Sequence, residues 1–199
     1  MANPAVGLLE FSSIARGIVS CDAMVKQAPV ATAYAGTVHP GKYLVLVAGD
    51  TASVEEALAA GREVGAGLVL DQVFLPDIHQ DVVGAMIAPD PARPESGEAL
   101  GVVETATVAA VIDAADAGIK AAEVVIGQLG LADGLGGKGY VLFAGIVADV
   151  EAAVEAAVAR AGRQLVESVV IASLHEELAE NLWAAPRFLE RIHGHEVGA

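Results

Sequence analysis

Two segments of this 199-residue chain are copies of one another, and this duplication constrains the fold more than any other feature. Residues 5–36 align without gaps with residues 99–130, and 11 of the 32 pairs are identical. Residues 41–79 align in the same way with residues 137–175, and 13 of the 39 pairs are identical. Matched glycines, lysines, aspartates and histidines hold the register, so an alanine-rich composition alone does not explain the match. We therefore expect two copies of one domain.

A proline-rich segment separates the two copies. Residues 89–98 contain three prolines and lack apolar periodicity, which is typical of a linker. We therefore predict a first domain over residues 1–88, a linker over residues 89–98 and a second domain over residues 99–199. A helical tail is expected around residues 186–193 of the second domain.

Both copies predict the same order of elements, β-α-β-β-α-β. Strands are expected at residues 6–11, 30–34, 43–47 and 68–75 of the first copy, and at residues 100–105, 124–129, 140–143 and 165–171 of the second. Short helices are expected to follow at residues 80–86 and 176–183. This order is that of a ferredoxin-like α+β domain, in which two helices cover one face of an antiparallel sheet.

The first helix of each copy carries an apolar face. Its residues recur in steps of four, three and four, as Ile14, Ile18, Cys21 and Val25, with the counterparts Val108, Ile112, Ala115 and Ile119. We expect this face to be buried, and we interpret Cys21 as a small buried hydrophobe. The second helix is predicted to open near Ser53, where Ser53-Val54-Glu55-Glu56 fits a capping box.

Charge and composition exclude several classes of function. The formal net charge of −15 repels a phosphate backbone, so nucleic acid is not expected as a partner. The sequence shows no signal peptide and no uninterrupted 18-residue apolar span, so we expect a soluble cytosolic protein outside the membrane. The single cysteine, Cys21, cannot form an internal disulfide.

No pattern in the sequence predicts an active site. A nucleophile–base pair and a Cys/His metal spacing are both missing from it. Residues 134–139 match the letters of the dinucleotide fingerprint, but this loop is expected to open a strand and not a helix, so we interpret it as a turn. His193 and His195 have no third ligand nearby in sequence and are interpreted as part of a tail. We therefore expect no enzyme activity, no metal and no cofactor.

Two lysines and two histidines recur at matched positions. Lys26 and Lys120 each end the first helix of a copy, where a cation offsets the helix dipole. Compensation of the helix dipole explains a lysine at one of these positions, but it explains less well why both copies carry a lysine at the same position. His79 and His175 recur after the last strand, which indicates a shared structural or edge role. His39 is interpreted as a solvated turn residue, although three copies meeting at an axis would form a weakly cationic, pH-dependent constriction.

The repeated unit resembles the bacterial microcompartment shell domain. The matching elements of the first copy are Ala5-Val6-Gly7-Leu8-Leu9-Glu10, the helix end at residues 22–26, the turn at Gly41, residues 45–50 and the strand ending at His79. The second copy repeats them at residues 99–104, 116–120, 137 and 144–145. Two such domains in one chain are similar to the tandem, trimer-forming class of these shell proteins.

This resemblance implies a structural protein of a microcompartment shell in the cytoplasm, built as a homotrimer shaped like a pseudohexamer. Six domains would surround a pore for small metabolites, and the tiles would pack edge to edge with other shell proteins, both hexamers and pentamers. The pore-lining residues that it implies are His39, Pro40, Gly41, Leu135, Gly136 and Gly137. The residues that it implies at the edge between tiles are Lys26, Lys120, His79 and His175.

Some tandem shell proteins of this kind hold an iron–sulfur cluster on the axis through a pore-loop cysteine. The pore loops of this sequence contain no cysteine, so we expect no cluster. A second hypothesis comes from another functional class, a trimeric ferredoxin-like sensor that binds small ligands in clefts between subunits.

Overall fold

A computed structural model describes residues 4–87 and 98–184 of the chain. Most of the predicted linker, the predicted tail around residues 186–193, and His193 and His195 lie outside the described residues.

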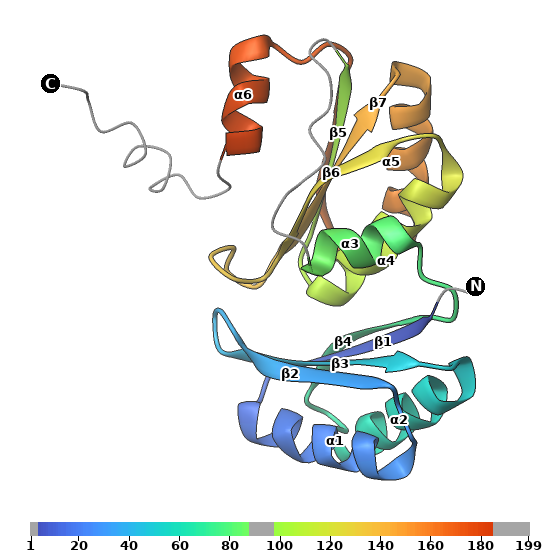
Figure 1. Ribbon diagram of the computed structural model, residues 1–199. Coiled ribbons are helices and arrows are strands. Elements are labelled where there is room, and N and C mark those ends of the chain that lie inside the picture. Colours follow the sequence, from blue (N-terminus) through green and yellow to red (C-terminus); the bar gives the residue numbers. More distant parts are fainter. Residues whose placement is uncertain (1–3, 88–97, 185–199) are drawn as a thin grey trace, which may run out of the picture.

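The first copy folds as a four-stranded antiparallel sheet with two helices on one face (Figure 1). Its elements are β1 (Ala5–Phe11), α1 (Ile14–Gln27), β2 (Thr32–Val38), β3 (Lys42–Gly49), α2 (Thr51–Val64), β4 (Val69–Leu75) and the short helix α3 (Gln80–Ile87). The strand order is β2-β3-β1-β4. Each strand is seven or eight residues long. Because successive side chains point to opposite faces, the sheet has one face for the helices and one face for a second layer.

The second copy repeats this arrangement. Its elements are β5 (Ala99–Thr105), α4 (Val108–Ala121), β6 (Val125–Leu131), β7 (Gly139–Gly145), α5 (Val147–Ala161), the 3₁₀ turn η1 (Gly162–Gln164), β8 (Leu165–Ile171) and α6 (Glu176–Ala184). The strand order is β6-β7-β5-β8, and both central strands shift register at the same place, after Glu10 and after Glu104. The predicted pair of ferredoxin-like α+β domains is therefore confirmed.

Two local predictions were wrong. Helix α2 begins at Thr51, and its N-cap is Asp50, whose side chain accepts the Ser53 N–H at 3.0 Å. Hydrogen bonding from Ser53 holds the pKa of Asp50 below its ordinary value. Asp50 takes the cap because it directly precedes the helix and lies three residues before Ser53, the spacing at which an N-cap side chain accepts a free backbone N–H.

The apolar face of α1 is the second correction. Ile14, Ile18 and Val25 are 41%, 52% and 44% exposed, and Cys21 is half-buried. The buried residues of α1 are instead Gly17, Ser20 and Met24. In α4 the matching face, Val108, Ile112, Ala115 and Ile119, is buried.

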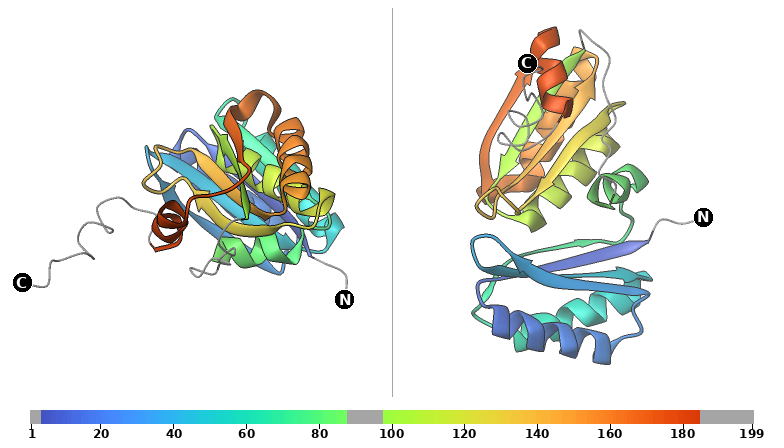
Figure 2. Two further views of the ribbon diagram at one scale, coloured as in Figure 1. Left: turned by 90° about the horizontal axis from the view of Figure 1, so that it is seen from above. Right: turned by 60° about the vertical axis from the view of Figure 1, so that its left-hand side comes forward.

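The difference arises because the second domain packs on the first (Figures 1 and 2). Helix α4 lies against β4 and β1, on the sheet face opposite to α1 and α2. Helix α3 lies on the second domain, against β6 and α4. One core cluster therefore includes Val6, Leu8, Val73 and Leu75 of the first domain together with Val108, Ile112 and Ala115 of the second. The two domains share a continuous core.

Candidate assembly surface and pore loops

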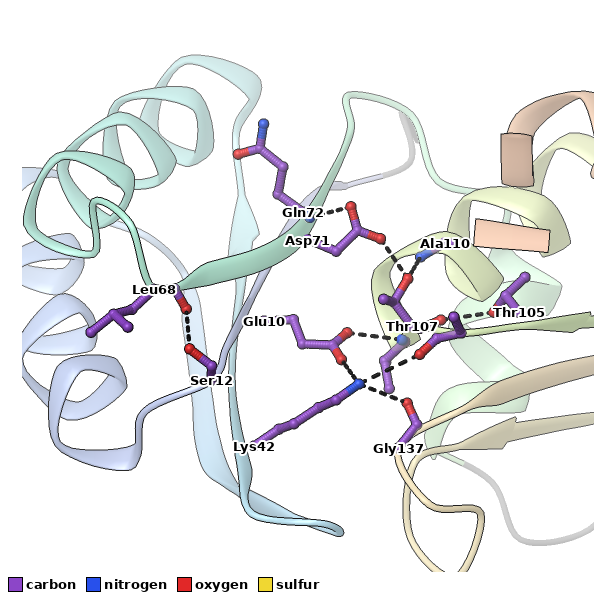
Figure 3. Close-up of polar contacts among 12 residues, drawn as sticks. Glu10, Ser12, Lys42, Leu68, Asp71, Gln72, Thr105, Thr107, Ala110 and Gly137 are labelled. Carbon is purple, nitrogen blue, oxygen red and sulfur yellow. Dashed lines mark hydrogen bonds and ion pairs between the residues drawn. The ribbon is translucent and has the colours of Figure 1, made fainter. Parts of the chain in front are cut away.

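A buried ion pair lies where the two domains meet, close to the β2–β3 loop (Figure 3). Lys42 Nζ donates to Glu10 Oε1 at 2.6 Å, and the side chains are 18% and 0% exposed. The same ammonium donates to the carbonyl oxygens of Gly137, at 3.1 Å, and Ala106, at 3.4 Å. Lys42 thus ties its own sheet to two segments of the second domain, and its charge is compensated inside the contact.

The second oxygen of Glu10 binds the start of helix α4. Glu10 Oε2 accepts the Val108 N–H at 2.9 Å, and Val108 is the first residue of that helix. The N-cap residue Thr107 accepts the Ala110 N–H at 3.3 Å and donates its own hydroxyl to Asp71 of the first domain. Two carboxylates of the first domain therefore face the positive end of a helix in the second, where negative charge is stabilised.

The far end of α4 is held by a second group of polar contacts. Asp116 accepts the His79 N–H at 2.7 Å and also pairs with Lys120 at 2.7 Å. Lys120 Nζ additionally donates to the carbonyl oxygen of Asp77. Lys120 and His79, both predicted at a tile edge, thus lie at the junction between the two domains of one chain, and the Lys120 side chain remains 39% exposed.

The two predicted pore loops lie side by side, although they are about 95 residues apart in sequence. The His39 N–H donates to Asp133 Oδ1 at 3.4 Å, and His39 Nδ1 lies 3.6 Å from the same oxygen. A Cβ added to Gly137 would lie 2.9 Å from Pro40 Cδ. The sequence argument missed Lys42 and Asp133 as loop-joining residues. Lys42 carried a signal, because it recurs as Lys138 after the matched glycine.

The second domain contains the matching ion pair, but there the two side chains are partly exposed to solvent. Lys138 Nζ donates to Glu104 Oε1 at 2.8 Å, with side chains 50% and 34% exposed. Lys26 pairs with Asp22 at 2.6 Å, as Lys120 pairs with Asp116, but Lys26 is 73% exposed. His175 accepts the Glu177 N–H at 3.3 Å, as His79 accepts the Asp81 N–H. The sheet of the second domain thus repeats the sheet side of the junction, and α1 of the first domain repeats its helix side. In residues 4–87 and 98–184 neither set of groups has a domain packed on it.

Other chemistry is sparse in the part of the chain that the structure describes. Residues 4–87 and 98–184 contain no group of three or more His, Cys, Asp or Glu side chains placed to hold a metal ion. Cys21 lies on α1, where burial and then the negative charge of Asp22 raise the pKa of its thiol. None of the described helices combines the length and hydropathy that a membrane span requires.

Comparison with known proteins places this arrangement in a family. The profile of the BMC domain matches residues 5–78 and again residues 99–174. The chain is 39% identical over 178 residues to "Bacterial microcompartment shell protein PduT" of Citrobacter freundii, covering 88% of this chain and 96% of the relative.

Two solved structures share the fold. A microcompartments protein from Desulfitobacterium hafniense DCB superposes with a TM-score of 0.75 at 42% identity, over 89% of this chain and 98% of that one. A fused permuted hexameric shell protein of the RMM microcompartment superposes with a TM-score of 0.59 at 23% identity, over 81% of this chain and 82% of that one, and supports the fold alone.

The chain therefore belongs to the BMC domain family, as a tandem-domain microcompartment shell protein similar to PduT. The resemblance drawn from the repeated motifs is confirmed, and the role of such a protein is structural and not enzymatic.

Proposed function

We propose that three copies of this chain form a trimeric, pseudohexameric tile of a microcompartment shell, with a central pore through which small metabolites pass. The observation that carries the proposal is the exposed apolar face of α1. The matching face of α4 is buried on the first domain, and nothing within the described chain covers Ile14, Ile18 and Val25.

The surface that would receive α1 is also exposed. In the first domain α4 packs over Val73 of β4, which is 5% exposed, whereas the matching residue Val169 of β8 is 46% exposed. Helix α6 covers another part of this face, through a cluster with Leu100, Leu142 and Leu174. Each chain thus has one helix face and one sheet face that match the two sides of its own domain junction.

Two different surfaces that fit one another make a head-to-tail contact. Repeating such a contact gives a closed ring or an open filament. The family resemblance implies closure at three chains, which alternates the two kinds of domain around one axis.

Closure of this ring would gather the two adjacent loops of each chain around the axis. The residues that we propose to line the pore are His39, Pro40, Gly41, Leu135, Gly136 and Gly137. Backbone groups of such glycine-rich turns can pair with polar solutes, which suits passive passage of small metabolites.

Contacts between tiles complete the proposal. Lys26, Lys120, His79 and His175 are proposed to lie along the tile edge, facing other shell proteins. Small contact energies at each edge would add up across a sheet of tiles.

The mass of the protein in solution tests the proposal, together with electron microscopy of the concentrated protein. We expect particles of three times the 20.1 kDa chain mass, and flat sheets or tubes at high concentration. A monomeric mass contradicts the trimer. Discrete trimers that form no sheets and carry a tightly bound small ligand would instead support the sensor hypothesis.

A further inference from the structure

We infer that the N-terminus of α1 in one chain seats on Glu104, Lys138 and Glu167 of a second copy, repeating the contact that Glu10, Lys42 and Asp71 make with α4. This inference rests on the proposed trimer and names the residues through which its chains join. The partner is a second copy of this chain because the polar groups at both ends of α4 in the known junction have counterparts on the two exposed surfaces. These groups are Glu10, Lys42, Asp71, His79, Thr107 and Asp116.

The acceptor side is already assembled in the second domain. Glu104 and Lys138 form the pair at 2.8 Å that Glu10 and Lys42 form at 2.6 Å. The exposed side chain of Glu167 accepts the N–H of Ser168, just as Asp71 accepts the N–H of Gln72. The second domain therefore presents two carboxylates and one ammonium in the arrangement that holds a helix start in the first.

The donor side is assembled on α1. Its N-cap Ser13 accepts the Arg16 N–H at 3.3 Å, as Thr107 accepts the Ala110 N–H at 3.3 Å. Seated on a second copy, the Ser13 hydroxyl donates to Glu167 and the Ile14 N–H donates to Glu104. Lys138 then donates to the carbonyl oxygens of Ser12 and Gly41, the counterparts of Ala106 and Gly137.

The outer end of the contact is matched as well. Asp22 is held by Lys26 at 2.6 Å, as Asp116 is held by Lys120 at 2.7 Å. In the known junction Asp116 accepts the His79 N–H, so Asp22 accepts the His175 N–H of the second copy. The apolar face of α1 lies between these two ends, over Val169.

Site-directed cross-linking tests this pairing. In a Cys21→Ala background, Ser13→Cys and Glu167→Cys are introduced into one chain, and a short bifunctional thiol reagent is added. We expect denaturing gels to show chains joined as dimers and closed trimers. The matched control, Asp71→Cys with Thr107→Cys, joins the known junction and leaves only single chains with altered mobility.

A second pair, Asp22→Cys with His175→Cys, tests the outer end in the same way, and it keeps the test valid if Ser13→Cys weakens the helix cap. The mass of each unreacted variant separates the outcomes. Trimeric mass without links between chains at either pair overturns this inference and leaves the proposed trimer in place. Monomeric mass of the Cys21→Ala parent overturns both.

Discussion

Glu10 and Val108 are 98 residues apart, yet the buried carboxylate of Glu10 accepts the backbone N–H that begins helix α4 at 2.9 Å. This bond joins the middle of one sheet to the first helix of the next domain. The carboxylate also holds Lys42, so one side chain compensates an ammonium and a helix start together.

Replacing Glu10 should therefore destabilise the whole chain. We expect Glu10→Gln to lower the free energy of unfolding by about 3 kcal/mol, because it leaves the mostly buried Lys42 ammonium unpaired. Urea unfolding at one fixed protein concentration measures the change. The control Arg160→Gln breaks the pair with Asp113, in which Arg160 is 55% exposed, and should cost less than about 1 kcal/mol. Equal losses in the two variants would contradict the assigned role of Glu10.

Ile18→Asp should dissociate the proposed trimer without unfolding the chain. Ile18 is 52% exposed within one chain, whereas its counterpart Ile112 is fully buried at the domain junction. A charge buried in the contact would weaken association by several kcal/mol, and sedimentation should show monomers. Val19→Asp is the matched control, since Val19 is 51% exposed and the second copy already carries Asp113 there. The control should stay trimeric.

Cys21 should react slowly with thiol reagents. Burial and the charge of Asp22 raise the pKa of its thiol, so less thiolate is present at any given pH than in a free cysteine. The labelling rate should therefore level off at a higher pH than the rate of a free cysteine in a reference peptide measured beside it. If the proposed trimer covers α1, labelling should be slower in the parent protein than in Ile18→Asp, because Ala115, the counterpart of Cys21, is fully buried. Identical rates in both proteins would argue against coverage of α1.

Substitutions at two glycines of the proposed pore loops should distinguish the cost of backbone strain from the cost of losing the contact between the loops. Gly41 has a φ of +107° and open space around a built Cβ, whereas Gly137 has a φ of +84° and Pro40 within 2.9 Å. We expect Gly41→Ala to lower the free energy of unfolding by roughly 1 to 2 kcal/mol through backbone strain alone. Gly137→Ala should lower it further, because the added methyl group also pushes the two loops apart. Urea midpoints compare them. A smaller loss for Gly137→Ala would mean that the loops are not held together.

The edge assignment has its own test. Lys26→Ala combined with Lys120→Ala should abolish sheets in electron micrographs while the mass remains trimeric. The pair of Lys26 with Asp22 is exposed, at 73% and 58%, and contributes at most about 1 kcal/mol. Lys120 pairs with Asp116 of its own chain, so its loss weakens the junction between the two domains and not the contact between chains. If the trimers themselves fall apart, the two lysines do not belong to the tile edge.

The fold could be predicted from the sequence because each copy repeats the same alternation of elements, and the repeat removed most ambiguity about strand order. The apolar face of α1 was also visible in its spacing. Periodicity identifies an apolar face but not the surface that covers it. Within residues 4–87 and 98–184 no surface covers Ile14, Ile18 and Val25. The burial of this helix was therefore misassigned.

The residues of the candidate site were predictable only where the same residue occurs at the matched position of both copies. Lys42 and Lys138 occupy matched positions, as do Glu10 and Glu104, so the two ion pairs were implicit in the repeat. Asp133, which accepts the His39 N–H, lies between the two aligned segments, where the offset between the copies changes by two residues. No repeat signal could mark it.

The packing of α4 on the sheet of the first domain affects how the sequences of the two copies can diverge. This contact lies within one chain, so dilution cannot separate the two domains. A substitution in it changes the folding stability of the chain and not an affinity between chains. In the proposed trimer the matching face of α1 meets its partner only when chains encounter one another, so a substitution there changes the affinity between chains. The two duplicated helix faces are thus under different constraints, one on folding and one on association. Their sequences can therefore diverge, as the aliphatic face of α4 and the cysteine-containing face of α1 do.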